Sequence, residues 1–482
     1  MRDGGRLTAA LEVLTEIETR HKPVRLAMKN WGEGARYAGS KDRAFISGLV
    51  LDVLRRRRSL GWRMGDDSLR SAVLGTLHLR WDWPIERLAE AAGDEVHGHG
   101  PLTDAERQAL ASPRDLADAP AAVRGDYPDW LEPSLIRAFG DDRADELAAL
   151  AERAPVDLRV NTLKTDPQRA LKAMTPFDAR PPGLMPNALR VAAPAAADRS
   201  GAVEAIPQFS KGWFEIQDLG SQIAAAAAGD VKGQQVLDLC AGGGGKTLAL
   251  AAAMGNTGQI YAYDSDARRL TDTIRRGDRA GVRNLQVRTP LNPEPLKDLV
   301  GKMGVVFIDA PCSGTGSWRR HPDTKWKLTP ETLAKRQADQ DQVLKDGAGF
   351  VKPGGRMIYV TCSVLPEEDE DRVAAFLAAH PEFVRTSATT DPELLQFLTP
   401  EGDLRLTPNL RHRRLLRRGA AEGGIGGLPS ASPHFPIWID QVRRPMETFQ
   451  GFEFARPPPR WRRVGWWCGR CVDANSASGF ST

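Results

Sequence analysis

Four short apolar runs in the second half of the chain constrain its fold more than any other feature. They are VLDL (236–239), QIYAY (259–263), VVFI (305–308) and RMIYV (356–360), and helical stretches separate them. Apolar strands that alternate with helices are typical of a parallel sheet covered on both faces. We therefore predict an α/β fold from about residue 226, with ligands bound at the carboxyl ends of its strands.

Two regions precede the predicted sheet. Residues 1–120 predict a helical domain, since apolar residues recur at helical spacing after Ser40, the expected N-cap of one helix. The polar, Gly- and Pro-containing segment 98–115 is typical of a linker. A second unit covers about residues 126–225 and contains a strand-like segment at 157–164.

The charge of the chain is concentrated near its end. The net charge is +4, but residues 411–482 alone hold 12 Arg, no Lys and five acidic residues. Residues 1–410 therefore carry 54 basic and 57 acidic residues, so an RNA-binding surface there must be a local patch. The run Arg55–Arg58 is one candidate. It is either a solvated helix end that interacts with the helix dipole or a phosphate contact.

Composition excludes several classes of protein. No run approaches the roughly 18 apolar residues of a membrane helix, and the amphipathic N-terminus does not resemble a signal peptide. Five cysteines in a long chain argue against a disulfide framework. We expect a cytoplasmic monomer that uses no metal, no membrane and no obligate protein partner.

The segment VLDLCAGGGGKT (236–247) reads as a strand, a glycine loop and the start of a helix, and two ligand classes fit it. A P-loop nucleotide site would use Gly245, Lys246 and Thr247, but Cys240 stands where its first glycine belongs. An adenosyl cofactor would need an acid after the next strand to bind ribose hydroxyls. Asp264, 22 residues after Gly242, is the favoured acid, and Asp266 is the alternative.

Two cysteines follow the third and fourth apolar runs. They are Cys312 in DAPCSGTG (309–316) and Cys362 in TCSVLPEEDE (361–370), and each is followed by Ser. A buried cysteine is often only a small core residue. Two at the same end of one sheet favour a shared chemical function.

These motifs resemble the Sun/Fmu/Nop (RsmB/NSUN-type) family of RNA cytosine-5 methyltransferases, most of all its bacterial 16S rRNA enzymes. The likeness extends over about residues 5–410 and includes QDLGSQ (217–222), RVNTLK (159–164) and RRHPD (319–323). It implies a Rossmann-like class I methyltransferase domain at 226–410. It also implies an all-helical, NusB-like RNA-binding domain at 1–120 and a small α+β RNA-recognition region at 126–225.

The resemblance assigns chemistry to the cysteines. Attack of a thiolate on C6 of cytosine makes the ring an enamine, so that C5 can accept a methyl group from S-adenosylmethionine. The resemblance gives the attack to Cys362 and the release of the product to Cys312. It places Asp309 at the amidine edge of the base. A free thiol with a pKa of about 8.5 is only about 3% ionised at pH 7, so the site must assist ionisation. A target base would have to leave its stack, which favours loop or single-stranded RNA, with small-subunit rRNA expected.

The residues expected to hold the cofactor are Cys240, Ala241, Gly242, Gly243, Gly244, Gly245, Lys246, Asp264 and Asp309. Two departures from the family stand out. Gly243 replaces the proline of the family loop A-P-G-G-K. The segment 284–296 has no acid before Glu294, so the adenine contact falls to backbone groups or to Asn292.

The end of the chain departs further. Family members close their sheet with a strand reading roughly T-D-G-F-F-A-A, but here RHRRLLRRGAAE (411–422) follows LRLTP (404–408). Codons for HRRLLRRGAAE exist that give T-D-G-F-F-A-A-V-L-R when read one nucleotide later. We therefore expect residues 411–482 to be a frameshifted, disordered tail and the closing strand to be missing. The alternative is a genuine Arg-rich extension that binds RNA.

Two further functions remain open. A P-loop NTPase would be stabilised by ATP–Mg rather than by S-adenosylmethionine. A non-catalytic ribosome assembly factor would bind RNA without transferring a methyl group.

Overall fold

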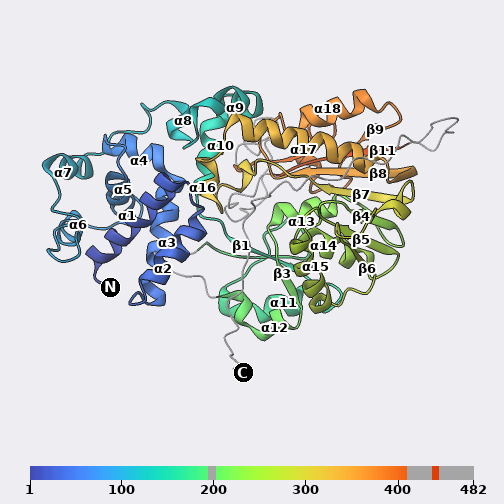
Figure 1. Cartoon of the computed structure of the whole chain (residues 1–482), viewed down its shortest axis with the longest axis horizontal. Coiled ribbons are helices and arrows are strands. Elements are labelled where there is room, and N and C mark those ends of the chain that lie inside the picture. The colour runs from blue at the N-terminus through green and yellow to red at the C-terminus, as the bar shows by residue number, and fades with distance from the viewer. Residues whose placement is uncertain (194–201, 410–436, 445–482) are drawn as a thin grey trace, which may run out of the picture. The chain divides into compact units, whose positions relative to one another are not determined.

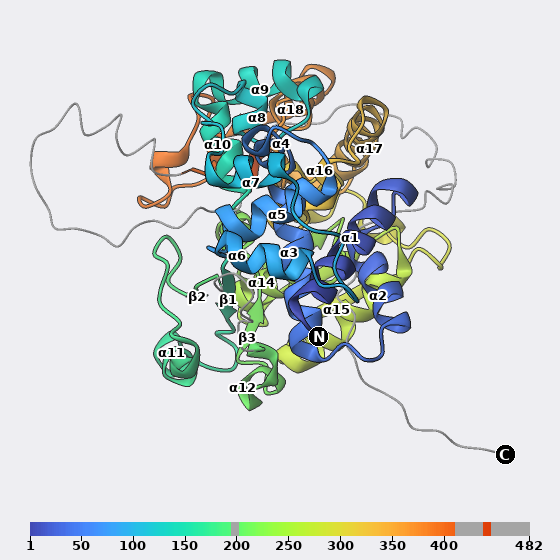
Figure 2. The ribbon, with the colours of Figure 1, turned by 90° about the vertical axis from the view of Figure 1, so that its left-hand side faces the viewer.

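A computed structural model describes residues 1–193, 202–409 and 437–444 (Figure 1). The N-terminal domain is helical, as predicted, and Figure 2 looks onto it. Its helices are α1 (Asp3–Arg20), α2 (Val24–Gly34), α3 (Ser40–Arg55), α4 (Arg57–Met64), α5 (Leu69–Leu79), α6 (Ile85–Ala92) and α7 (Asp104–Ala111). None of the helices in the described ranges is long and apolar enough to span a membrane.

Two local predictions for this domain were wrong. Ser40 is the first residue of α3, and Gly39 is its N-cap. The Asp42 carboxylate accepts the Gly39 N–H at 3.2 Å, so the acid in the first turn does the capping. The expected linker 98–115 contains α7, because Thr103 and Glu106 form a capping box at its start.

The next region contains a three-stranded antiparallel sheet of order β2-β1-β3. The strand predicted at 157–164 is β1, which ends at Val160 because an Asn161-centred turn follows. The helices and strands of this region are α8 (Ala121–Arg124), α9 (Glu132–Phe139), α10 (Arg143–Leu150), β1 (Val156–Val160), α11 (Pro167–Ala173), β2 (Ala188–Val191), α12 (Pro207–Ser210) and β3 (Phe214–Ile216).

The large sheet confirms the predicted α/β fold. Its order is β10-β11-β8-β7-β4-β5-β6, and β9 pairs with β11. The strands β4 to β8 run parallel, and each predicted apolar run lies in one of them except for Leu239, which follows β4. The strands are β4 (Gln235–Asp238), β5 (Gln259–Tyr263), β6 (Leu285–Arg288), β7 (Met303–Asp309), β8 (Val351–Thr361), β9 (Val384–Thr386), β10 (Leu404–Leu406) and β11 (Ile437–Arg443).

Helices cover both faces of this sheet (Figure 1). Alternate residues of the central strands point to opposite sides. Val305 and Phe307 pack with α13 and α14, whereas Val306 and Ile308 pack with α17 and α18. The covering helices are α13 (Leu219–Ala226), α14 (Gly245–Met254), α15 (Ala267–Ala280), α17 (Pro330–Ala348) and α18 (Glu370–Ala379), and the short α16 (Pro322–Lys325) lies outside them.

The expectation that the closing strand is missing was wrong. Strand β11, from the part of the chain expected to be a tail, pairs antiparallel with β8 from Trp438↔Thr361 to Arg443↔Arg356. Trp438 and Ile439 are buried in the two cores because they alternate across the strand. The expected Arg-rich segment 411–422 and the CGRC motif (468–471) lie outside the described residues, and the frameshift remains a prediction for the gene sequence to test.

Candidate active site

The two predicted cysteines lie side by side. Cys312 follows β7 and Cys362 follows β8, and these strands are parallel neighbours, so their carboxyl ends meet at one edge. The two Sγ atoms are 3.3 Å apart. The Gly316 N–H donates to the Cys362 carbonyl at 2.9 Å and fixes the two loops together. The contact with Cys362 and burial raise the pKa of the Cys312 thiol, which therefore keeps its proton at neutral pH.

The Glu368 carboxylate holds the Cys312 loop through hydrogen bonds with Ser313. The sequence did not predict this role. Glu368 is fully buried and accepts the Ser313 N–H at 2.7 Å, and it also accepts the Ser313 hydroxyl. Gln340 of α17 donates to the same carboxylate at 3.0 Å. Burial raises the pKa of Glu368, although its hydrogen bonds oppose the rise. Glu368 is one of five successive acids at 367–371, and nothing in that run identifies the acid that supports the Cys312 loop.

Lys246 and Asp309 form an ion pair next to the cysteines. The Lys246 Nζ lies 2.6 Å from the Asp309 Oδ2. Burial alone would lower the pKa of Lys246, but the Asp309 carboxylate and the nearby Cys362 offset it, and the pKa is raised. The lysine therefore stays charged at the cysteine end of the site, a placement that the sequence left open. Asp309 is 37% exposed, so its second oxygen can reach a ligand.

The glycine loop lies at the end of β4 and has the shape that its sequence predicts. Gly242 has φ +56° and Gly244 has φ +80°, in the left-handed region that favours glycine. A Cβ on Gly242 would meet an Arg269 nitrogen at 2.4 Å, and one on Gly244 would meet Thr273 at 2.9 Å. The loop thus presents bare backbone at the start of α14, which fits an adenosyl cofactor approaching closely.

The two candidate ribose-binding acids have different surroundings. Asp264 is buried against the loop and accepts the Gly242 N–H at 2.8 Å. Asp266 caps α15 by accepting the Arg268 N–H at 3.0 Å. Asp264 is thus fastened to the glycine loop and Asp266 to its own helix, and the choice of Asp264 as the ribose-binding acid stays a prediction. Asn292 is exposed in the turn after β6, and the adenine contact stays unassigned.

Cys240, Ala241 and Gly245 complete the predicted cofactor segment. Cys240 packs against the core of the α17 face, and burial raises the pKa of its thiol. The Ala241 N–H donates to the Tyr263 carbonyl at 2.8 Å, and Gly245 begins α14. Asp238, the last residue of β4, is fully buried next to this segment. The sequence did not predict a role for it. Asp238 accepts the Thr247 hydroxyl at 2.6 Å, and burial raises its pKa to about 7.

The basic run at 55–58 is not a solvated helix end, because its arginines form ion pairs with acids, and a phosphate contact by the partly exposed Arg57 and Arg58 stays a prediction. Arg55 is buried, pairs with Asp52 at 2.8 Å and donates to the Arg319 carbonyl at 2.8 Å. Arg56 pairs with Glu152 at 2.7 Å. Arg55 therefore joins the helical domain to the RRHPD segment that follows the Cys312 loop.

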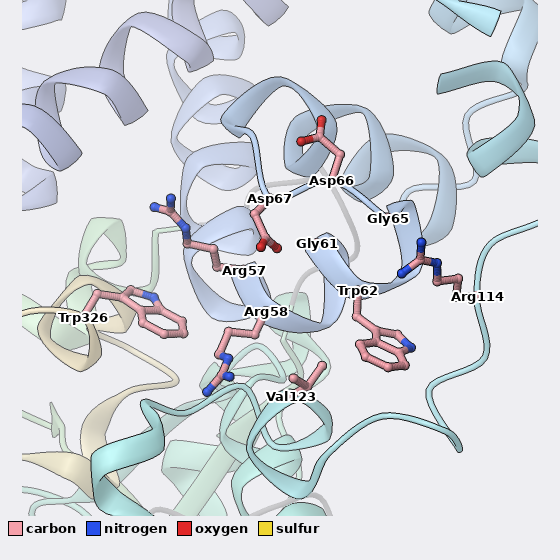
Figure 3. A pocket seen from close by; sticks show the side chains of 10 residues that line it. All are labelled: Arg57, Arg58, Gly61, Trp62, Gly65, Asp66, Asp67, Arg114, Val123 and Trp326. Carbon is pink, nitrogen blue, oxygen red and sulfur yellow. The ribbon is translucent and has the colours of Figure 1, made fainter. Parts of the chain in front are cut away.

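A pocket of about 600 Å³ lies beside this run, with Trp62 and Trp326 on opposite sides (Figure 3). Two of its arginines, Arg57 and Arg58, form ion pairs with Glu18 and Asp129. Two carboxylates also line it, so its charge is mixed. No group of three or more His, Cys, Asp or Glu that could hold a metal ion occurs in the described parts of the chain.

Comparisons with known proteins agree with this geometry. Residues 227–414 match the family described as 16S rRNA methyltransferase RsmB/F, and residues 127–198 match the ferredoxin-like domain of RsmF/B-like methyltransferases. A probable ribosomal RNA small subunit methyltransferase B from Synechocystis is 28% identical over 402 residues, which are 77% of this chain and 89% of that protein. The ribosomal RNA small subunit methyltransferase B of Citrobacter koseri is 33% identical over 298 residues, which are 61% of this chain and 67% of that protein.

The fold is also similar to a solved structure. The crystal structure of PH0851 superposes with a TM-score of 0.65 at 21% identity, and the match covers 92% of this chain and 99% of that one. This likeness concerns the fold alone.

Proposed function

Because the chain belongs to the RsmB/F family of 16S rRNA methyltransferases, we propose that it methylates C5 of a cytosine in RNA through a covalent bond between Cys362 and C6. The observation that carries the proposal is the 3.3 Å separation of the Cys312 and Cys362 sulfurs, at the ends of adjacent strands. One thiol can then form the bond to the base while the other acts on the same ring.

The surroundings of the two thiols support different roles. Lys246 carries a positive charge near the Cys362 sulfur, and a thiol must become a thiolate before it can attack the base. The contact with Cys362 and burial raise the pKa of the Cys312 thiol, which disfavours its thiolate. In product release, which we assign to Cys312, a base takes the proton from C5, the electron pair of that C–H bond forms the C5=C6 double bond, and the Cys362 sulfur leaves C6 as a thiolate.

Asp309 and the glycine loop complete the proposed site. The exposed oxygen of Asp309 would contact the N3 and N4 edge of the cytosine, where charge changes during the attack. S-adenosylmethionine, held by the loop 240–246 and Asp264, supplies the methyl group. The bare backbone at Gly242 and Gly244 is the structural feature that fits it.

The test is a pair of variants incubated with small-subunit rRNA and labelled S-adenosylmethionine. Cys312→Ala should accumulate an RNA–protein adduct that survives denaturing electrophoresis. Cys362→Ala should form neither adduct nor methylated RNA. If Cys312→Ala turns over normally without an adduct, the division of roles is wrong.

The same assay separates the alternatives. An assembly factor without catalysis would bind RNA equally well with Cys362→Ala, and the unaltered chain would transfer no methyl group. Parallel reactions with tRNA and large-subunit rRNA would show whether small-subunit rRNA is the substrate.

A further inference from the structure

The cofactor loop contains four successive glycines, Gly242–Gly245. Its conformation must therefore be held by contacts from other elements. Fixing the backbone of a residue costs conformational entropy, and glycine loses more freedom than other residues. No side chain of the loop itself can hold its shape. Contacts from other elements must therefore keep it ready for a ligand.

Three such contacts reach the loop. The Gly242 N–H donates to Asp264, and the Gly242 carbonyl accepts the Thr273 hydroxyl at 3.0 Å. The Gly243 carbonyl accepts a guanidinium N–H of Arg276, from the middle of α15. Arg276 is thus the side chain that holds the centre of the loop.

The other side of the same guanidinium is also fixed. Arg276 donates from Nε and Nη2 to one oxygen of Glu215, at 3.1 and 3.0 Å. Glu215 lies on β3 of the small sheet and is only 2% exposed. Its second oxygen pairs with Arg279, one turn further along α15. Two arginines therefore form ion pairs with the buried Glu215 carboxylate and fix its position.

We propose that Arg276 is a positioning residue that sets the affinity for S-adenosylmethionine by fastening the Gly243 carbonyl to Glu215. The proposal rests on the proposed function, since it takes the loop as the cofactor site. It connects three segments: the cofactor loop, α15 and the small sheet that precedes the methyltransferase domain. Arg276 lies outside the reacting groups, so it acts on binding rather than on the chemical step.

Gly243 offers a way to test the physical cause. Unlike Gly242 and Gly244, it does not have a positive φ, and a Cβ there would meet only an Arg276 nitrogen at 3.5 Å. Alanine is therefore compatible with the backbone at this position. Replacing glycine by alanine at a compatible site stabilises a backbone by about 0.4–1 kcal/mol, since fewer unfolded conformations compete.

The experiment measures the dissociation constant of S-adenosylmethionine by calorimetry. Arg276→Ala should weaken binding about tenfold, which corresponds to about 1.4 kcal/mol. Adding Gly243→Ala to that variant should recover about two- to fivefold. Arg276→Lys, which keeps the charge but not the two-sided contact, should lie between. The matched control is Arg275→Ala, the adjacent and more exposed arginine that pairs with Asp272 on its own helix.

Two further readouts complete the test. In Arg276→Ala, the KM for S-adenosylmethionine should rise more than kcat falls. The amide of Gly244, which donates to the Ala241 carbonyl, should exchange its hydrogen faster in the variant without cofactor. An unchanged dissociation constant in Arg276→Ala would overturn the proposal. If the unaltered chain does not bind S-adenosylmethionine, the proposed function fails, and unchanged exchange at Gly244 would then refute the positioning role separately.

Discussion

At the scale of single residues, the site separates two identical side chains by their surroundings. Cys312 and Cys362 are in sulfur contact, and that contact together with burial raises the pKa of the Cys312 thiol. Lys246 and Asp309 bring an ion pair to the same edge of the sheet. A thiolate is far more nucleophilic than a thiol, so such differences can decide which sulfur attacks.

The hydrogen bonds of Glu368 allow a prediction about the different roles of Cys312 and Cys362. In Glu368→Gln, the new amide group would face the donors of Ser313 or Gln340, so at least one contact with the Cys312 loop is lost. A buried donor left without a partner costs about 1–3 kcal/mol. We expect kcat to fall about ten- to hundredfold and the RNA adduct to accumulate, because release is affected more than attack.

The control for this prediction is Glu367→Gln, the neighbouring acid that binds Ser134 and Arg137 near the surface. Adduct and turnover would be followed in the same single-turnover reactions. A fall in adduct formation that matches the fall in turnover would indicate a general loss of structure and would contradict the positioning role.

At the scale of elements, strand β11 contains an unusual buried polar group. Asp440 is 1% exposed and lies beside Asp403, which is fully buried, and both pair with Arg385. Burial raises the pKa of Asp440, and the Asp403 carboxylate raises it further. One arginine thus serves two carboxyl groups, so the strand closes the sheet at some cost in stability.

This arrangement predicts a pH dependence. A carboxyl group with a raised folded-state pKa stabilises the fold fully below its unfolded pKa of about 4, and that contribution is lost as pH rises through the folded-state pKa. Asp440→Asn should therefore raise the midpoint of thermal unfolding at pH 8, by about 2–4 °C for each kcal/mol, and change it little at pH 4. Scanning calorimetry would measure both midpoints.

The comparison needs an exposed aspartate as control, and Asp391→Asn provides one. An equal shift of the Asp440→Asn midpoint at both pH values would show that the carboxyl pair does not titrate as described.

At the scale of the whole molecule, the RRHPD segment fastens the Cys312 loop to the helical domain. Arg55 donates to the Arg319 carbonyl, and Lys325 donates to the Arg55 carbonyl at 2.9 Å. The Trp326 indole donates to the Leu54 carbonyl at 2.7 Å. These contacts bring together residues that are more than 260 positions apart in the sequence.

Arg55→Ala should destabilise the protein strongly, because it leaves the Arg319 carbonyl buried and removes one partner of Asp52. Breaking a buried pair costs about 3–5 kcal/mol, whereas an exposed pair such as Arg57–Glu18 contributes about 1 kcal/mol or less. Urea unfolding of Arg55→Ala and Arg57→Ala would measure the difference. Equal losses of unfolding free energy in the two variants would contradict the structural role of the buried arginine.

The sequence by itself determined the parts of this protein that depend on local pattern. The apolar run at 259–263 is β5 with the same bounds, the runs at 305–308 and 356–360 lie within β7 and β8, and the run at 236–239 extends one residue beyond β4. The meeting of Cys312 and Cys362 was also predictable, since the ends of parallel strands share one edge. The positive φ values at Gly242 and Gly244 follow from the residue type.

Only the tertiary structure decided the contacts between distant segments. The burial of Arg55, the support of Ser313 by Glu368 and the fastening of Gly243 by Arg276 all join charged residues that are common on surfaces. Nothing in their local sequence distinguishes a solvated charge from a paired one, because the partner that removes the cost of burial comes from elsewhere in the chain. The place of β11 in the sheet was likewise decided by the tertiary structure, since β8 supplies its hydrogen-bond partners.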